Sequence, residues 1–173
     1  MAKLEFSVED RQWNGVDFIN LVTLSCATTL KYLGVDDRFN ISVLGCNDKR
    51  ISELNLEFRK LKEPTNVLSW PNKDRSAKSS GAVPQIPIFK QNVDTELGDL
   101  AFSYPYCARE AKSIGCPLSE HITHLTVHGT LHLLGFDHIS TGDMRLMTKV
   151  EVCILNVLGL EDPYKWEYYK VQH

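Results

Sequence analysis

Three histidines near residue 130 have the types and the spacing of a metal site. His128, His132 and His138 stand at offsets of zero, four and ten, and Gly135 lies between the last two. On an α-helix, residues four apart share one face, so His128 and His132 can direct ring nitrogens at one point. Gly135 can adopt the left-handed conformation that ends a helix, and the following turn can return the chain to that point with His138.

Three imidazoles with an open fourth position describe a catalytic Zn²⁺ site better than a structural one, in which Cys or His usually fills all four positions. A single histidine on an apolar helix face is more often an ordinary core or surface residue. Here the surrounding leucines argue against that alternative, because unpaired buried imidazoles are costly. His121 and His124 precede the site on what we expect to be the same helix, and for these two we prefer a structural role.

The spacing matches the zinc-peptidase pattern H-E-x-x-H-x-x-G-x-x-H in every ligand and in the glycine. The difference lies at Gly129, where the peptidase has the glutamate that acts as general base. General base catalysis contributes about 10²- to 10⁴-fold to a rate. We therefore expect the scaffold of a zinc peptidase with different chemistry.

The string H-G-x-L-H-L-x-G-x-D-H at residues 128–138 closely resembles the signature of the YbeY family, single-strand-specific endoribonucleases of rRNA maturation. Two more segments resemble family patterns, in the same order along the chain. Residues 59–71 resemble R-x-x-x-x-P-T-N-V-L-S-F-P, with Trp70 in place of phenylalanine. Residues 96–100 contain a segment similar to L-G-D-I, with leucine in place of isoleucine.

The resemblance implies a zinc-dependent endoribonuclease that cleaves single-stranded RNA, with one zinc per chain held by His128, His132 and His138. It implies action on the 3′ end of small-subunit rRNA and in ribosome quality control. The implied partners are the ribosomal small subunit and associated factors, including a GTPase. Gly129 would then leave room beside the metal for a bulky phosphodiester.

Arg59 matches the functional arginine of the family, so the resemblance assigns it to phosphate binding and transition-state stabilisation. A guanidinium suits that role because its planar fork bonds two phosphate oxygens and keeps its charge. The alternative is a surface cation that complements a helix dipole.

Four other polar residues are candidates for supporting roles. Asp137 could accept the N–H of a ligating imidazole, which we favour, or cap a turn, or help to activate water. Asn66, Ser69 and Asp99 could position the substrate, although turn chemistry explains such residues equally well. No residue is assigned as the general base.

Two other functions are compatible with the pattern. The first is a zinc peptidase or amidase that recruits a carboxylate from elsewhere in the chain. The second is a ribosome-assembly factor whose zinc is structural, in which case loss of the metal should unfold the domain.

The composition indicates one cytoplasmic domain covering residues 1–173. A chain of this length buries about 70% of its unfolded surface. No apolar stretch of about 18 residues occurs, so we expect no membrane association. The five cysteines are scattered and form no C-x-x-C pair, which indicates free thiols in a reducing compartment. The net charge is −3, yet residues 49–90 carry nine basic and four acidic side chains and could form a basic patch.

The predicted elements place the histidines on a helix packed against a sheet. Helices are expected at 16–33, from Asn47 to before Pro64, at 106–114, at 117–134 and from Ser140 or Thr141 to Gly159, and strands at 39–46, 67–70 and 97–104. Residues 72–95 are expected to form a mobile loop, in which 86–89 could add an edge strand. We expect an α+β fold with a single mixed sheet packed with helices, similar to the zincins, which are metal-dependent hydrolases.

Overall fold

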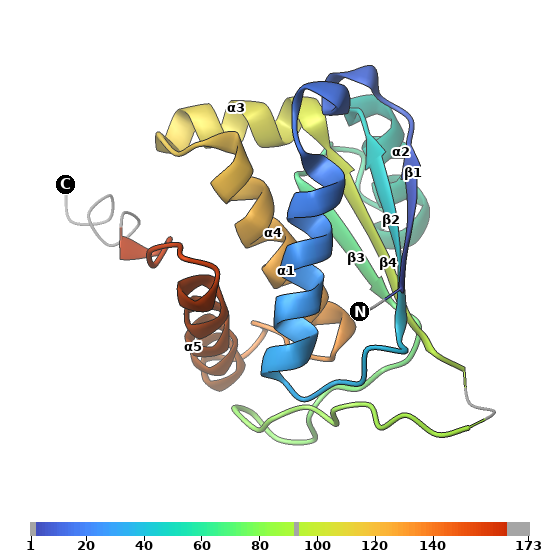
Figure 1. Ribbon diagram of the computed structural model, residues 1–173, viewed down its shortest axis with the longest axis vertical. Coiled ribbons are helices and arrows are strands. Elements are labelled where there is room, and N and C mark those ends of the chain that lie inside the picture. The colour runs from blue at the N-terminus through green and yellow to red at the C-terminus, as the bar shows by residue number, and fades with distance from the viewer. Residues whose placement is uncertain (1–2, 92–93, 166–173) are drawn as a thin grey trace.

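A four-stranded mixed sheet organises the computed structural model, which describes residues 3–91 and 94–165 (Figure 1). The elements are β1 (Lys3–Val8), a 3₁₀ turn η1 (Arg11–Gly15), α1 (Phe18–Tyr32), β2 (Asn40–Cys46), α2 (Asp48–Arg59), β3 (Val67–Pro71), β4 (Glu96–Ser103), α3 (Tyr104–Ile114), α4 (Leu118–Leu133) and α5 (Thr141–Val157). The predicted α+β class with a single mixed sheet is confirmed.

The strands lie in the order β1-β2-β4-β3. β1, β2 and β4 are parallel, whereas β3 runs antiparallel to β4 at one edge. α1 and α4 cover one face of the sheet, and α2 lies on the other (Figure 1). Successive residues of a strand point to opposite faces, so Leu100 packs into the main core while Ala101 packs into a smaller one beneath α2.

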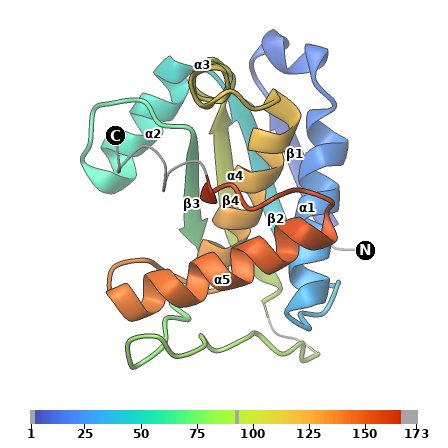
Figure 2. The same ribbon diagram turned by 90° about the vertical axis from the view of Figure 1, so that its left-hand side faces the viewer.

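α4 is the central helix of the molecule. It packs against α1, α3, α5 and the edge strand β3, and Figure 2 shows α5 crossing it. Its buried residues lie around most of its circumference, including Ile122, Val127 and Leu131. A helix enclosed on so many sides has little freedom to shift, so its side chains are held in fixed positions. Within residues 3–91 and 94–165, no helix has the length and apolar character needed to span a bilayer.

Most predicted helices and strands are present within a few residues of their expected bounds, but three details were wrong. β1 was not predicted, although Leu4 and Phe6 alternate with polar residues along it. Residues 86–89 form no strand. The buried stripe expected along the helix after Asn47 reaches Ile51, yet Phe58 and Leu61 near its end are about half exposed. Phe58 packs on one side only, against Trp70 of β3 at 5.0 Å between ring centroids, and Leu61 lies beyond the end of α2.

The described residues of the 72–95 segment form no regular element, but they contact the end of α4 and the start of α5. Arg75 is buried, and its Nη1 donates to the carbonyl of Leu133 at 3.3 Å. Gly81 donates its N–H to Asp143 Oδ1 at 2.8 Å. The Arg75 contact supplies a donor to a helix-end carbonyl that has no partner within its own helix. The expected mobility of this segment remains a prediction.

Candidate metal centre

The three histidines of the sequence pattern converge on one point. Each offers a ring nitrogen, and these nitrogens all lie within 4.8 Å of one another. Nε2 of His128 and Nε2 of His132 are 3.1 Å apart, and the ring of His138 lies 5.5 Å and 5.1 Å from theirs, centroid to centroid. Within the part of the chain that the structure describes, no other group of three His, Cys, Asp or Glu side chains converges in this way.

The end of α4 brings the third histidine back to the first two. The helix ends at Leu133, and Gly135 follows with a φ of +92°. Phe136 then donates its N–H to the carbonyl of Leu131 at 3.1 Å and buries its ring. A side chain at Gly135 would be strained by this φ and would collide with Arg75 of the 72–95 segment. The predicted glycine turn is therefore confirmed.

The Nδ1 atoms of the two helical histidines are turned away from the point of convergence. Nδ1 of His132 lies 2.9 Å from the carbonyl oxygen of Phe136. Nδ1 of His128 lies 3.3 Å from a carboxylate oxygen of Glu151. Contacts of this kind fix the orientation of an imidazole and keep the proton on Nδ1, which leaves Nε2 free to bind a metal.

The donor set fits a zinc ion. Two nitrogens that share a tetrahedral zinc at about 2.0–2.1 Å lie roughly 3.4 Å apart, close to the spacing of the two helical Nε2 atoms. Burial, with smaller contributions from His128 and His138, lowers the pKa of His132 to about 4. That imidazole is therefore neutral at pH 7, the form in which histidine binds metals.

Glu151 is a part of the site that the sequence analysis missed. It comes from α5, its side chain is 1% exposed, and it contacts His124, His128 and Tyr164. Burial acts to raise the pKa of Glu151, but its contacts with His124 and His128 outweigh that effect and lower the pKa to about 2. The sequence contained a signal for this residue, because Glu151 is a charged residue placed at helical spacing between Met147 and Ile154 on the buried face of α5.

Arg59 is the last residue of α2 and is exposed. Its side chain makes no ion pair or hydrogen bond with the residues that the structure describes. Its guanidinium is therefore available to an external anion. Exposure also fits the alternative of a cation at the end of a helix, so its role in phosphate binding remains a prediction.

Asn66 and Ser69 lie on the same side of the sheet edge as α4. Asn66 precedes β3, and its Nδ2 donates to Glu110 of α3 at 2.7 Å. Its Oδ1 accepts the N–H of Val67 at 2.6 Å. Ser69 lies within β3 and directs its hydroxyl at α4 beside Gly129. Asn66 therefore ties the start of β3 to α3, Ser69 packs against α4, and their role in positioning a substrate remains a prediction.

Asp99 and Asp137 are placed differently. Asp99 is exposed on the α2 side of the sheet, since it lines a groove there with Phe58 and Trp70, whereas α4 covers the opposite face. The sheet therefore separates Asp99 from the histidines. Asp137 accepts the backbone N–H of His138 at 2.7 Å, and its role beside the third histidine remains a prediction. The Nδ1 contacts of the helical histidines are made by Phe136 and Glu151 instead.

Gly129 does not leave open space beside the metal. A Cβ at this position would lie 2.9 Å from Leu100 Cδ2 and 3.0 Å from Ser69 Oγ. The absent side chain therefore allows β3 and β4 to approach α4 closely. The expectation that Gly129 leaves room for a phosphodiester is wrong, because the sheet occupies that room.

The two earlier histidines of α4 both pair with carboxylates. His121 is 5% exposed, and its Nε2 lies 2.7 Å from Oε2 of Glu110. His124 lies 2.9 Å from Glu151 through its Nε2. Neither belongs to the converging group, as expected of structural histidines.

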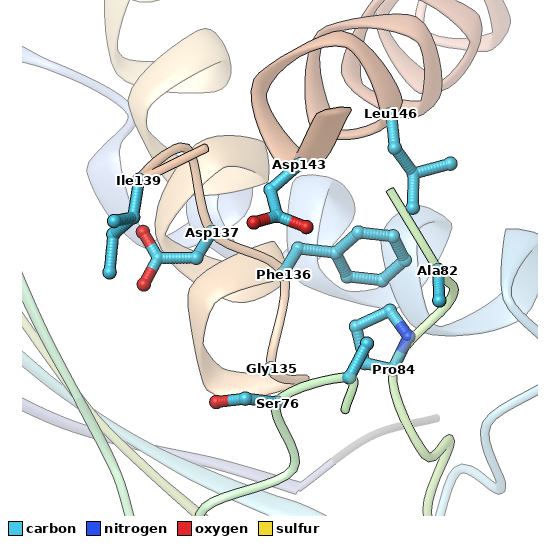
Figure 3. Close-up of a pocket in the computed structure, with 10 residues that line it drawn as sticks. Ser76, Ala82, Pro84, Gly135, Phe136, Asp137, Ile139, Asp143 and Leu146 are labelled. Carbon is cyan, nitrogen blue, oxygen red and sulfur yellow. The ribbon is translucent and has the colours of Figure 1, made fainter. Parts of the chain in front are cut away.

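A small cavity of about 220 Å³ lies beside the turn that carries His138 (Figure 3). Phe136 and Asp137 of the turn, Asp143 of α5 and Pro84 of the 72–95 segment point toward it. Its described lining residues include none of the three histidines, so the cavity is adjacent to the metal centre and separate from it.

The chain is similar to proteins of known family. Residues 4–159 match the family model described as endoribonuclease YbeY. Two relatives named endoribonuclease YbeY are those of Jannaschia sp. (strain CCS1), 44% identical over 94% of this chain and 99% of the relative, and of Dinoroseobacter shibae, 45% identical over 95% and 91%. A solution structure of TM1509 from Thermotoga maritima shares the fold, with a TM-score of 0.52 and 16% identity over 90% of this chain and 91% of that one.

The sequence match extends over nearly every element that builds the metal centre, from β1 through α5. The relatives are matched over almost their whole length, so the similarity is not confined to the histidine pattern. On these grounds the chain belongs to the endoribonuclease YbeY family.

Proposed function

We propose that this protein is a zinc-dependent endoribonuclease that cleaves single-stranded RNA. The observation that carries the proposal is the convergence of three imidazoles within 4.8 Å in a chain of an endoribonuclease family. We further propose the 3′ end of small-subunit rRNA as the substrate, a role in ribosome quality control, and the ribosomal small subunit, associated factors and a GTPase as cytoplasmic partners.

Each residue of the proposed site has a separate role in RNA cleavage. His128, His132 and His138 hold the ion, which when bound would activate water and polarise a phosphoryl oxygen. Arg59 binds the phosphate and stabilises the negative charge that develops on its oxygens during cleavage. Its exposure, and the lack of a side-chain partner among residues 3–91 and 94–165, support this assignment. Asn66 and Ser69 position the edge strand beside α4.

Several basic residues of the 49–90 region remain available for RNA, although others are occupied. Arg50 pairs with Glu9 and Glu53, Lys73 pairs with Asp94, and Arg75 is buried. Exposed cations in this region include Lys49, Arg59, Lys62, Lys78 and Lys90. This distribution supports contacts to a phosphate backbone despite the net charge of −3.

The test is cleavage of a labelled single-stranded rRNA fragment and of its duplex. We expect cleavage of the single strand alone, its loss with a chelator, and its recovery when zinc is added back. His132→Ala should bind less zinc and cleave no RNA. Cleavage that continues in metal-free protein would refute the proposed function.

The zinc-peptidase alternative is tested on the same preparation with a generic peptide library. It lacks support at Gly129, where Leu100 and Ser69 fill the space that a glutamate would need. Peptide cleavage that requires His132, without cleavage of RNA, would favour it.

A further inference from the structure

A buried carboxylate lies directly behind one of the three histidines. Glu151 belongs to α5, and its side chain is 1% exposed although its neighbours on the chain reach the surface. Its Oε1 lies 3.3 Å from Nδ1 of His128 and 2.9 Å from Nε2 of His124. Its Oε2 accepts the hydroxyl of Tyr164 at 2.6 Å. Burial of an ionised carboxylate is costly, so each contact that offsets the cost is informative.

The oxygen atoms behind the Nδ1 atoms of His128 and His132 differ in charge. Both rings present Nε2 to the point of convergence, where these atoms are 3.1 Å apart. Behind His132, the acceptor for Nδ1 is the neutral carbonyl oxygen of Phe136. Behind His128, the nearest oxygen is Oε1 of the anionic Glu151, 3.3 Å from Nδ1, and this buried oxygen has no other hydrogen bond among the described residues. A carboxylate in this position makes an imidazole a better metal ligand, because it fixes the tautomer and offsets the charge of the ion.

We propose that Glu151 is the positioning residue of the metal centre, accepting the Nδ1–H of His128 so that Nε2 faces the metal. Tyr164 and His124 hold the carboxylate in place from its other sides. The inference rests on the metal site of the proposed function and adds to it a residue of α5, far along the chain from the histidine pattern. It also gives Tyr164, which follows α5, a role in supporting the site.

The competing explanation is that Glu151 serves only His124, its nearer imidazole neighbour, and that His128 is close by coincidence. Zinc affinity separates the two explanations. A carboxylate that orients a ligand changes zinc affinity when it is altered, whereas a purely structural pair changes only the stability of the fold.

The chain offers a matched control at another histidine of α4. Glu110 contacts His121 at 2.7 Å, as Glu151 contacts His124 and His128, but His121 is outside the converging group. Glu151→Gln and Glu110→Gln make the same chemical change in two His–Glu pairs of α4, although the Glu110 side chain is 33% exposed and that of Glu151 only 1%. We expect both to lower thermal stability, and only the first to weaken zinc binding.

The measurement is zinc affinity by competition with a chromogenic chelator, with circular dichroism to check folding. We expect Glu151→Gln to weaken zinc binding about 10- to 100-fold and Glu110→Gln to change it less than about twofold. Equal affinity in wild type and Glu151→Gln would overturn the inference while leaving the proposed function intact. Absence of zinc binding in wild type would overturn both.

A second measurement uses the unaltered protein and does not depend on the folding of a variant. Long-range ¹H–¹⁵N correlation spectra of the histidine side chains report which ring nitrogen carries the proton. In zinc-loaded wild type we expect His128 to be protonated at Nδ1 and bound through Nε2. Metal bound through Nδ1 of His128 would contradict the inference.

Discussion

Arg59 is the residue whose proposed role is purely chemical. It is exposed at the end of α2 and makes no ion pair with the described residues. Its side chain therefore contributes little to the fold, because isolated surface substitutions usually change stability by less than about 0.5 kcal/mol.

We expect Arg59→Ala to cut RNA cleavage by at least about tenfold while thermal stability and zinc content stay unchanged, because the lost contact acts on the transition state. Arg59→Lys should recover part of the activity, since an ammonium lacks the bidentate fork. The measurement is single-turnover cleavage of single-stranded RNA. Arg50→Ala, which removes a partly exposed arginine of the same helix that pairs with Glu9, is the control. Cleavage at the wild-type rate by Arg59→Ala would show that Arg59 does not take part in catalysis and is a surface cation at the end of its helix.

Glu110 is a residue whose charge should matter for stability. Hydrogen bonding from His121, the largest contribution, lowers the pKa of Glu110, although burial opposes the shift. A carboxyl group whose pKa is lower in the folded state stabilises the fold above its unfolded pKa. That contribution is lost as the pH falls through the folded pKa.

We therefore expect Glu110→Gln to be less stable than wild type at pH 7, and the difference to shrink as the pH falls below about 4. Urea unfolding at several pH values between 3 and 7 measures it. A difference that is constant over this range would show that the ionised carboxylate of Glu110 contributes nothing.

At the scale of elements, the metal centre depends on how closely α4 approaches the edge of the sheet. Gly129 faces β3 and β4, where Ser69 and Leu100 leave no room for a Cβ. Overpacking of this kind costs about 1–3 kcal/mol, and an alanine recovers up to about 1 kcal/mol through its better helix propensity.

We expect Gly129→Ala to lower the free energy of unfolding by about 1 kcal/mol, and Gly129→Glu to force α4 away from β3 and lose zinc as well as RNA cleavage. Urea unfolding and zinc content are the measurements. Gly15→Glu, at an exposed glycine with open space around it, is the control. A stable Gly129→Glu protein with full zinc content would show that the helix and the edge strand can separate without harm.

The turn after α4 is a second contact between elements on which the centre depends. Gly135→Ala should reduce zinc binding and stability together, because the new Cβ would be strained by the φ of +92° and would collide with Arg75. Gly115→Ala separates the two effects, since Gly115 has a φ of +76° but open space around it. Zinc affinity and thermal stability of the pair are compared. Equal losses of zinc affinity in both variants would exclude a role for the Arg75 contact.

At the scale of the whole molecule, the core that stabilises the fold is larger than the metal centre. Buried apolar residues from α1, the sheet, α4 and α5 form one continuous cluster. The five cysteines are free, as the composition predicted, so disulfides do not contribute. The three converging histidines lie at one end of α4. Contacts with Phe136 and Glu151, which do not depend on a metal, orient His132 and His128.

Removal of zinc should therefore leave the domain folded. With zinc at about 100 times its Kd, binding adds about 2.7 kcal/mol of stability, or a rise in Tm of roughly 5–10 °C for a chain of this size. Circular dichroism before and after dialysis against a chelator measures the loss. Unfolding of the metal-free protein at 25 °C would support the alternative of an assembly factor with a structural zinc.

The local features of this protein follow from its amino-acid pattern. Periodicity and caps located most helices and strands, and Asn47 and Ser140 cap their helices as predicted. The convergence of His128 and His132 and the turn at Gly135 could be predicted because an α-helix fixes the relative positions of residues four apart, and because a left-handed turn needs glycine. Local rules suffice where the interacting residues are close in the chain.

Contacts between residues that are far apart in the chain could be established only from the packing of the whole fold. Glu151 follows His128 by 23 positions, and only the packing of α5 on α4 brings it to that imidazole. Asp99 lies in a segment resembling the family pattern, yet the alternation of side chains along β4 directs it to the opposite face from the histidines. Gly129 was assigned to the chemistry from its position in the pattern, whereas the structure shows it packed against a strand some 60 residues earlier in the chain. Register and helix packing depend on contacts across the whole fold, which one-dimensional spacing does not contain.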